Sequence, residues 1–95
     1  MSEIARVVSA TPVINGVLKV VWDDGHEAVV DCRPIIAKGK AFAFLGSAHR
    51  FAAVEVGEHG SSVYWVDDEG RVVDLGALGL RETADMQAEL LRYAS

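Results

Sequence analysis

Alternating apolar positions organise the chain around the segment from Val17 to Cys32. Within it, two apolar runs flank a polar Asp-Asp-Gly stretch at residues 23–25, which is the composition of a β-hairpin. Because successive side chains of a strand point to opposite faces, each run places three apolar residues on one face. These residues are Leu18, Val20 and Trp22 in the first run and Ala28, Val30 and Cys32 in the second.

The length of the loop decides whether the two apolar sets share one face of the hairpin. A two-residue loop would pair Val20 with Val29 and send the sets to opposite faces. A three-residue loop, with Gly25 left-handed in a bulge, pairs Val20 with Ala28 and creates one apolar face, so we predict that register. Its other pairs are Trp22 with His26 and Leu18 with Val30.

A first strand, a second hairpin and a last helix are predicted around this hairpin. Residues 5–13 form the first strand, which Pro12 places at a sheet edge, and Asn15-Gly16 supplies the turn that follows. The bulged-loop geometry pairs Val8 with Trp22 and Ala10 with Val20. Residues 52–56 and 62–66 form the second hairpin, and 67–70 turn the chain into 71–75.

Short helical segments are predicted between and after the two meanders. Proline near its start and glycine after its end predict one helical turn in residues 33–39. Ser47 is placed to cap another short helix, whereas the apolar run at 41–45 fits either a strand or a buried connection. Gly76 and Gly79 loosen the backbone, and Thr83 then caps a last helix over about 82–93. We therefore expect an α+β fold: an antiparallel twisted sheet of two meander units with short intervening helices and a C-terminal helix.

Apolar residues on the second face of the central strands predict self-association. Val17, Val21 and Val29 lie opposite the Leu18 set, and a sheet that is apolar on both faces must be covered twice. One C-terminal helix, whose apolar stripe is Met86, Leu90 and Tyr93, covers only part of that area. We expect a homodimer, with this stripe as a candidate dimer contact.

Composition places the chain among single, folded domains. It has 95 residues, of which 51% are hydrophobic and 24% charged, so we treat residues 1–95 as one domain. No apolar run is long enough to cross a bilayer, and residues 1–6 lack the pattern of a signal peptide. The single cysteine, Cys32, excludes an internal disulfide and fits a reducing cytoplasm. A net charge of −5 argues against direct nucleic-acid binding.

No arrangement of residue types in the sequence indicates catalysis or a metal site. The three histidines lack the spacing of zinc ligands and have no Cys-x-x-Cys beside them. Cys32 alternates inward with Val30, which indicates a small core residue. We therefore expect no catalytic residue, no metal and no cofactor, although an undetected enzyme stays an alternative.

Charge is distributed unevenly along the acidic chain. No Asp or Glu occurs between residues 32 and 54, whereas four basic residues do. These are Arg33, Lys38, Lys40 and Arg50. They form either a solvated face or a contact for an anion or an acidic partner, so a small-ligand or anion sensor is an alternative function.

Motifs spread along the chain carry a resemblance to a known family. They are Leu18-x-Val20-x-Trp22-x-Asp24-Gly25, Val30-Asp31-x-x-Pro34, Phe42-x-x-Leu45, Phe51-x-x-Val54-x-Val56, Val63-x-Trp65 and Asp74-Leu75. From about residue 7 to 80, the chain resembles a bacterial domain-of-unknown-function family, number 2442.

The resemblance implies a small α+β domain with no assigned activity or site residue. Members are sometimes fused ahead of a helix-turn-helix domain, stand alone, or are encoded beside a second small protein in what look like toxin–antitoxin pairs. This chain departs from the family at Val66 and the acidic residues 67–69, and it ends in one helix. We expect a non-catalytic, cytoplasmic protein-interaction module, the antitoxin-like or regulatory partner of a second small protein.

Overall fold

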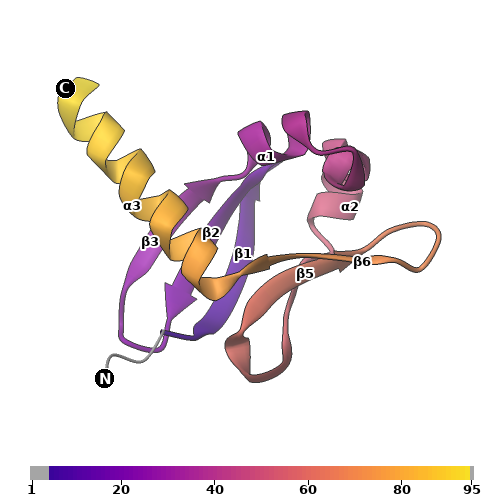
Figure 1. Cartoon of the computed structure of the whole chain (residues 1–95), viewed down its shortest axis with the longest axis horizontal. Helices are drawn as coiled ribbons and strands as arrows, with labels where there is room; N and C mark the ends of the chain where they lie inside the picture. The colour runs from indigo at the N-terminus through magenta and orange to yellow at the C-terminus, as the bar shows by residue number, and fades with distance from the viewer. Residues whose placement is uncertain (1–4, 95) are drawn as a thin grey trace.

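The computed structural model describes residues 5–94, without the side chains of residues 93 and 94, and has an α+β fold. Its first three strands form one antiparallel sheet in the order β1-β2-β3, and the next three form a second sheet in the order β4-β5-β6 (Figure 1). The two predicted meanders are thus present, as two sheets. The strands of the first sheet are β1 (Val7–Ile14), β2 (Val17–Trp22) and β3 (Glu27–Asp31).

The central hairpin has the predicted three-residue loop. Val20 lies opposite Ala28, and the backbone N–H of Trp22 donates to the carbonyl of His26 at 2.9 Å. Gly25 has a φ of 88°, the left-handed conformation that the bulge requires and that glycine adopts without strain. Both apolar sets therefore face the core, as predicted.

The predicted register of β1 is correct at one end and wrong at the other. Ala10 lies opposite Val20 as expected, but Val7, rather than Val8, lies opposite Trp22. The ladder shifts between Val7 and Ser9, which turns Val7 into the core and leaves Val8 exposed. β1 is an edge strand, as its proline predicts.

Three short helical segments connect the sheets. They are α1 (Arg33–Lys38), the 3₁₀ segment η1 (Lys40–Gly46) and α2 (Ala48–Phe51). The apolar run at 41–45 is thus a helical connection, and of its residues only Leu45 is fully buried. Ser47 precedes α2 as expected, but its side chain makes no capping hydrogen bond.

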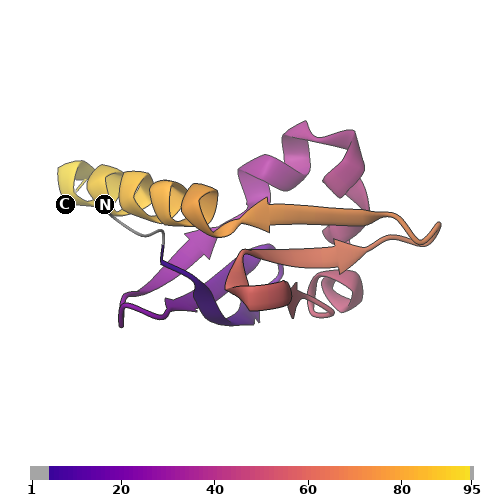
Figure 2. The ribbon, with the colours of Figure 1, turned by 60° about the horizontal axis from the view of Figure 1, so that its bottom comes forward.

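The second sheet contains the predicted hairpin and its continuation. Its elements are β4 (Glu55–Val56), the 3₁₀ turn η2 (Glu58–Gly60), β5 (Ser62–Val66) and β6 (Val72–Gly76). In the view of Figure 2, the tip of the β5–β6 hairpin and α3 (Ala77–Ala94) extend to opposite ends of the molecule.

The last helix begins earlier than predicted. It starts at Ala77 rather than near residue 82, so Gly79 lies within it and Thr83 is not a cap. The Thr83 hydroxyl instead donates to the carbonyl of Gly79 one turn back, at 2.8 Å. Burial of Leu80 in the core stabilises the first turns of the helix despite Gly79, because tertiary packing outweighs local propensity.

The core lies between the sheets and is centred on two tryptophans. Trp22 and Trp65 are each 1% exposed, and Trp22 lies on the core side of its hairpin as its apolar alternation predicts. The ring of Trp65 stacks on Phe51 with centroids 5.7 Å apart, and its indole N–H donates to the carbonyl of Phe51 at 2.9 Å. Cys32 is also buried, as predicted. The second sheet and α2 are thus held to the same core as the central hairpin.

Replacing Trp65 with alanine should lower the free energy of unfolding by about 3–5 kcal/mol, because it removes a buried aromatic side chain and leaves a cavity. Urea denaturation followed by circular dichroism measures this change. The neighbouring Val66, which is exposed, supplies the control: Val66→Ala should change stability by no more than about 0.5 kcal/mol. Equal effects of the two substitutions would show that Trp65 is not a core residue.

Candidate functional site

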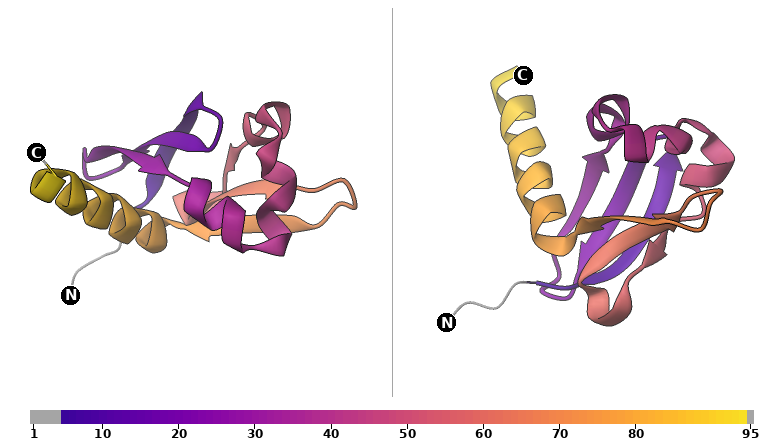
Figure 3. Two further views of the ribbon diagram at one scale, coloured as in Figure 1. Left: turned by 90° about the horizontal axis from the view of Figure 1, so that it is seen from above. Right: turned by 45° about the vertical axis from the view of Figure 1, so that its right-hand side comes forward.

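The first turns of α3 are attached to the end of the central hairpin. The indole N–H of Trp22 donates to the carbonyl of Ala77 at 3.4 Å, and the Arg81 guanidinium lies 5.2 Å from the centroid of the Trp22 ring. Arg81 also forms an ion pair with Asp24 in the hairpin loop, at 3.1 Å. These contacts set the position from which the helix runs along β3 (Figure 3).

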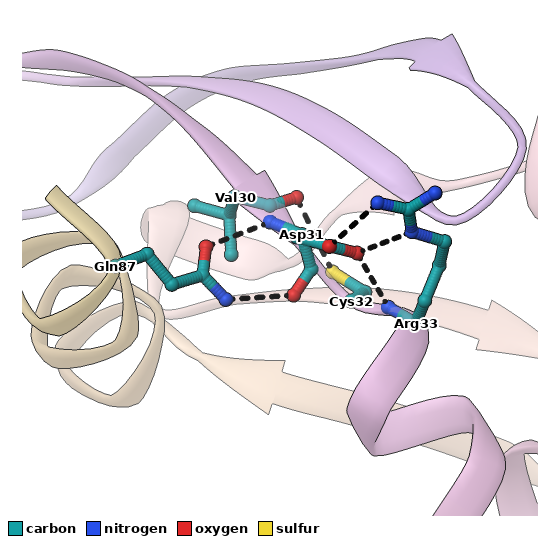
Figure 4. A network of polar contacts seen from close by, with 5 residues as sticks. All are labelled: Val30, Asp31, Cys32, Arg33 and Gln87. Carbon is teal, nitrogen blue, oxygen red and sulfur yellow. Dashed lines mark hydrogen bonds and ion pairs between the residues drawn. The ribbon is translucent and has the colours of Figure 1, made fainter. Parts of the chain in front are cut away.

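A second attachment joins the middle of α3 to the far end of β3. The backbone N–H of Asp31 donates to Oε1 of Gln87, and Nε2 of Gln87 donates to the carbonyl of Asp31, each at 2.9 Å (Figure 4). β3 is the outer strand of its sheet, so a neighbouring strand would bond to the same two backbone groups. The Gln87 amide takes the place of that strand at one residue.

The side chain of Asp31 organises the start of α1. Its Oδ1 accepts from the backbone N–H and Nε of Arg33, and its Oδ2 lies 2.8 Å from the guanidinium of the same residue. These hydrogen bonds lower the pKa of Asp31, against the opposing effect of partial burial, and the same contacts raise the pKa of Arg33. Both groups are therefore charged at neutral pH and satisfy each other.

Between β3 and α3 lies an open hollow of about 1010 Å³, which we call the β3–α3 groove. Its lining is mainly apolar and includes five side chains that are between 57% and 71% exposed. They are Ile14, Val29, Met86, Leu90 and Leu91. Single exposed apolar residues are common on protein surfaces, but five around one hollow are typical of an interaction site.

The second face of the first sheet is covered unequally. Val17, one of the three valines predicted to need cover, is buried at 7% exposure, whereas Val29 is 58% exposed. Of the predicted helix stripe, Met86 and Leu90 are exposed on α3, and the side chain of Tyr93 lies outside the described residues. The chain thus leaves part of this face uncovered, and a dimer contact through the stripe stays a prediction.

Two of the four basic residues singled out in the sequence form ion pairs with carboxylates. Arg33 is bound by Asp31, and the Arg50 guanidinium lies 2.7 Å from Asp68. Lys40 lines a smaller hollow of about 370 Å³ together with the acidic turn at residues 67–69. Lys38 is exposed on α1. Two of the four positive charges are therefore compensated, one by a neighbour in the sequence and one by the turn of the second sheet, and anion binding by these four residues stays a prediction.

The structure gathers no constellation for metal or catalytic chemistry within residues 5–94. No three His, Cys, Asp or Glu side chains in that range lie close enough to hold a metal ion. The Cys32 thiol is buried, and burial, followed by the charge of Asp31, raises its pKa to about 11. A thiol that keeps its proton at neutral pH is a poor nucleophile and a poor metal ligand. In the same range, no helix combines the length and hydropathy needed to cross a membrane.

Sequence reasoning missed two residues that shape the groove. Gln87 gave no signal, because an amide on a helix acquires its role only when the helix lies against a strand edge. Leu91 follows Leu80 and Ala84 at helical spacing, so the stripe of the correct helix would have identified it. Leu80 and Ala84 are buried, whereas Leu91 is 71% exposed, so the core-facing side of α3 extends past the core into the groove.

The raised pKa of Cys32 predicts a specific loss of stability at alkaline pH. The folded state keeps a proton that the unfolded chain releases near its ordinary pKa of 9.0, so stability should fall by up to about 2 kcal/mol as pH rises from 9 towards 11. Urea denaturation at several pH values measures the slope, and Cys32→Ala, which has no thiol to ionise, should show a smaller one. Identical slopes in the two proteins would contradict the assignment.

Comparison with known proteins yields one finding and two negative results. Residues 7–85 match the family model described as Protein of unknown function (DUF2442). A search of curated proteins found no match, and neither did a search of solved structures. The match covers most of the 95 residues, including both sheets and the first half of α3. The chain therefore belongs to the DUF2442 family, an uncharacterised family of domains.

Proposed function

We propose that this chain is a non-catalytic protein-interaction module whose binding surface is the β3–α3 groove. The observation that carries the proposal is the concentration of five exposed apolar side chains around one hollow of about 1010 Å³. Burial of such side chains against a partner is favourable by about 25 cal/mol per Å² of apolar surface. No comparable apolar surface surrounds the other hollow described above, whose lining is mostly charged.

The charges of the molecule support a protein partner rather than a nucleic acid or a small anion. The chain carries a net charge of −5, which opposes binding to a phosphate backbone. Arg33 and Arg50, which would have to bind an anion, are already engaged by Asp31 and Asp68. An incoming anion would compete with carboxylates that the fold holds in place.

We also propose that two copies of the chain associate through α3. Met86 and Leu90 are one helical turn apart and are 57% and 61% exposed, so they form a small apolar face on the helix. In a two-fold dimer the same face serves both copies, which is the commonest arrangement of soluble oligomers. A stable interface of this kind buries on the order of 1,000 Å² or more.

We further propose that the module acts in the bacterial cytoplasm as the regulatory, antitoxin-like partner of a second small protein. A single buried thiol needs no oxidising compartment, and this supports a cytoplasmic location. The groove supplies the surface that such a partner needs.

Sedimentation velocity tests the self-association. The wild-type chain should sediment as a dimer at tens of micromolar, and Leu90→Asp should weaken association by at least about tenfold, because a charge would then be buried in the interface. Leu78→Asp is the matched control, since Leu78 is also exposed on α3 but does not line the groove. A compact wild-type monomer at every concentration would refute the dimer.

A further inference from the structure

The two edges of the first sheet are built differently. On β1, Pro12 interrupts the row of backbone donors, and the register shifts twice, between Val7 and Ser9 and between Pro12 and Ile14. Proline and bulges are features that prevent an edge strand from pairing with another chain. β3 has neither, because its pairing with β2 is continuous over all five residues. The edge at β3 is therefore the one suited to accept another strand.

The hairpin register shows which backbone groups of β3 point outwards. The N–H of Trp22 donates to His26, and the N–H of Cys32 donates to Gly16, so the residues of β3 bonded to β2 are the even-numbered ones. The backbone groups of Glu27, Val29 and Asp31 therefore point away from the sheet. Gln87 binds those of Asp31. Within residues 5–94, no hydrogen bond occupies the outward backbone groups of Glu27 and Val29, so a partner strand can bind them.

We propose that the β3–α3 groove takes an extended segment of a partner protein, which adds to β3 as a fourth strand and alternates apolar with basic residues. This inference deepens the proposed function and rests on it. Strand addition of this kind obtains affinity from backbone hydrogen bonds and specificity from alternate side chains. Glu27 and Val29 together offer two donors and two acceptors to such a segment.

The alternation of apolar and basic side chains along the partner strand follows from the position of α3. Ala84 packs in the core beside Val30, so α3 lies on the core side of the sheet, whereas Val29 is on the opposite face. In an added antiparallel strand, residues bonded to Val29 and Glu27 share the face of Val29, and the intervening residues point towards α3. The intervening residues should therefore be apolar, because they contact the core-facing side of α3, which continues from Ala84 to Leu91, and they leave the face of Met86 and Leu90 to the proposed dimer.

The charged residues around the groove indicate which side chains the partner should carry at the positions that alternate with the apolar ones. The lining of the groove carries three carboxylates, on Glu27, Asp31 and Asp85, against the guanidinium of Arg33 and the imidazole of His26. Two of these carboxylates already have a cationic partner, because Arg33 is paired with Asp31, and Lys19, which lies opposite Val29 on β2, is 3.3 Å from Glu27. Glu27 and Asp31 flank Val29 on the face that carries the bonded residues of the partner. Lysine or arginine at those partner positions would lie across from these carboxylates and would share them with Lys19 and Arg33. Opposite charges in cross-strand positions are stabilising.

The same charges argue against a second copy of this chain as the added strand. A two-fold antiparallel pairing centred on Val29 would place Glu27 of each copy opposite Asp31 of the other. Like charges directly opposite each other are destabilising. The backbone of Asp31 is also already bonded to Gln87 in each copy. The edge of β3 is therefore suited to a different, basic segment.

Fluorescence anisotropy with synthetic peptides tests the proposal. The probe is a labelled seven-residue peptide of alternating Lys and Val, which should bind saturably with a dissociation constant below about 1 mM. A peptide of alternating Glu and Val should bind at least about tenfold more weakly because of the carboxylates around the groove. Methylation of the Lys backbone nitrogens, which should face β3, should abolish binding, whereas methylation of the Val backbone nitrogens should be tolerated.

A pair of protein variants at one position supplies the matching test. Val29→Pro removes an outward N–H and should weaken binding at least about tenfold, while Val29→Thr keeps the N–H and should bind like the wild type. The sheet tolerates proline at such a place, because Pro12 lies opposite Leu18, where the missing N–H would also point outwards. Circular dichroism verifies that both variants fold.

Each outcome decides between the proposals. Any of three results would overturn strand addition. The first is no saturable binding of the Lys–Val peptide up to about 1 mM, and the second is an equal loss of binding with either methylated peptide. The third is undiminished binding to a folded Val29→Pro variant. Equal affinity for the Glu–Val peptide would overturn the basic pattern. If the peptide fails while the wild-type chain still dimerises and Leu90→Asp separates the copies, only strand addition is wrong. If both assays fail, the interaction module itself is refuted.

Discussion

The backbone of an edge strand needs hydrogen-bond partners, and one glutamine side chain meets that need at the end of β3. Gln87 bonds both outward groups of Asp31, from a helix 56 residues further along the chain. Because Trp22 and Asp24 hold the first turns of the same helix, α3 is attached at two points and lies along β3. These two attachments, together with the burial of Leu80 and Ala84, set the groove between α3 and β3. The apolar residues of α3 beyond Gln87 extend past the core for the same reason.

Polar and apolar groups are distributed so that the polar ones are largely satisfied within the molecule. In the part of the chain that the structure describes, no side-chain nitrogen or oxygen is buried without a partner, and the core consists of apolar residues. The exposed ion pairs, such as Arg50 with Asp68, contribute little stability individually. Of the large apolar side chains that are exposed among the described residues, half line the groove, beside the open edge of β3. This combination is suited to binding another polypeptide.

The central hairpin could be predicted because two local rules agree on it. Alternation placed Leu18 and Val20 on one face, and Gly25 allowed the bulged turn that keeps Ala28 on the same face. The position of Val7 could not be predicted, because the bulge beside it leaves no mark in the apolar pattern. Register errors therefore arose where an irregularity, rather than periodicity, determined which residue faced the core.

The last helix and the groove depend on contacts between distant parts of the chain. Two glycines in residues 76–79 suggested a loose segment, but Leu80 packs in the core, and the N–H of Ala77 donates to the carbonyl of Ser61 at the start of the helix. The partner of Arg50 could likewise not be read from the sequence, since Asp68 meets Arg50 only after the second sheet has formed. Sequence patterns identified the apolar surface of α3 but could not show which strand edge it lies beside.

Native-state amide hydrogen exchange along β3 tests the central claim most directly. The amides of Ala28 and Val30, which bond to β2, should exchange slowly, and those of Glu27 and Val29 should exchange at least about a hundredfold faster because they face the open groove. Asp31 should be slow in the wild type and fast in Gln87→Ala, while Val30 stays slow as the internal control. Protection of Val29 equal to that of Val30, or an Asp31 amide unaffected by the substitution, would contradict the account.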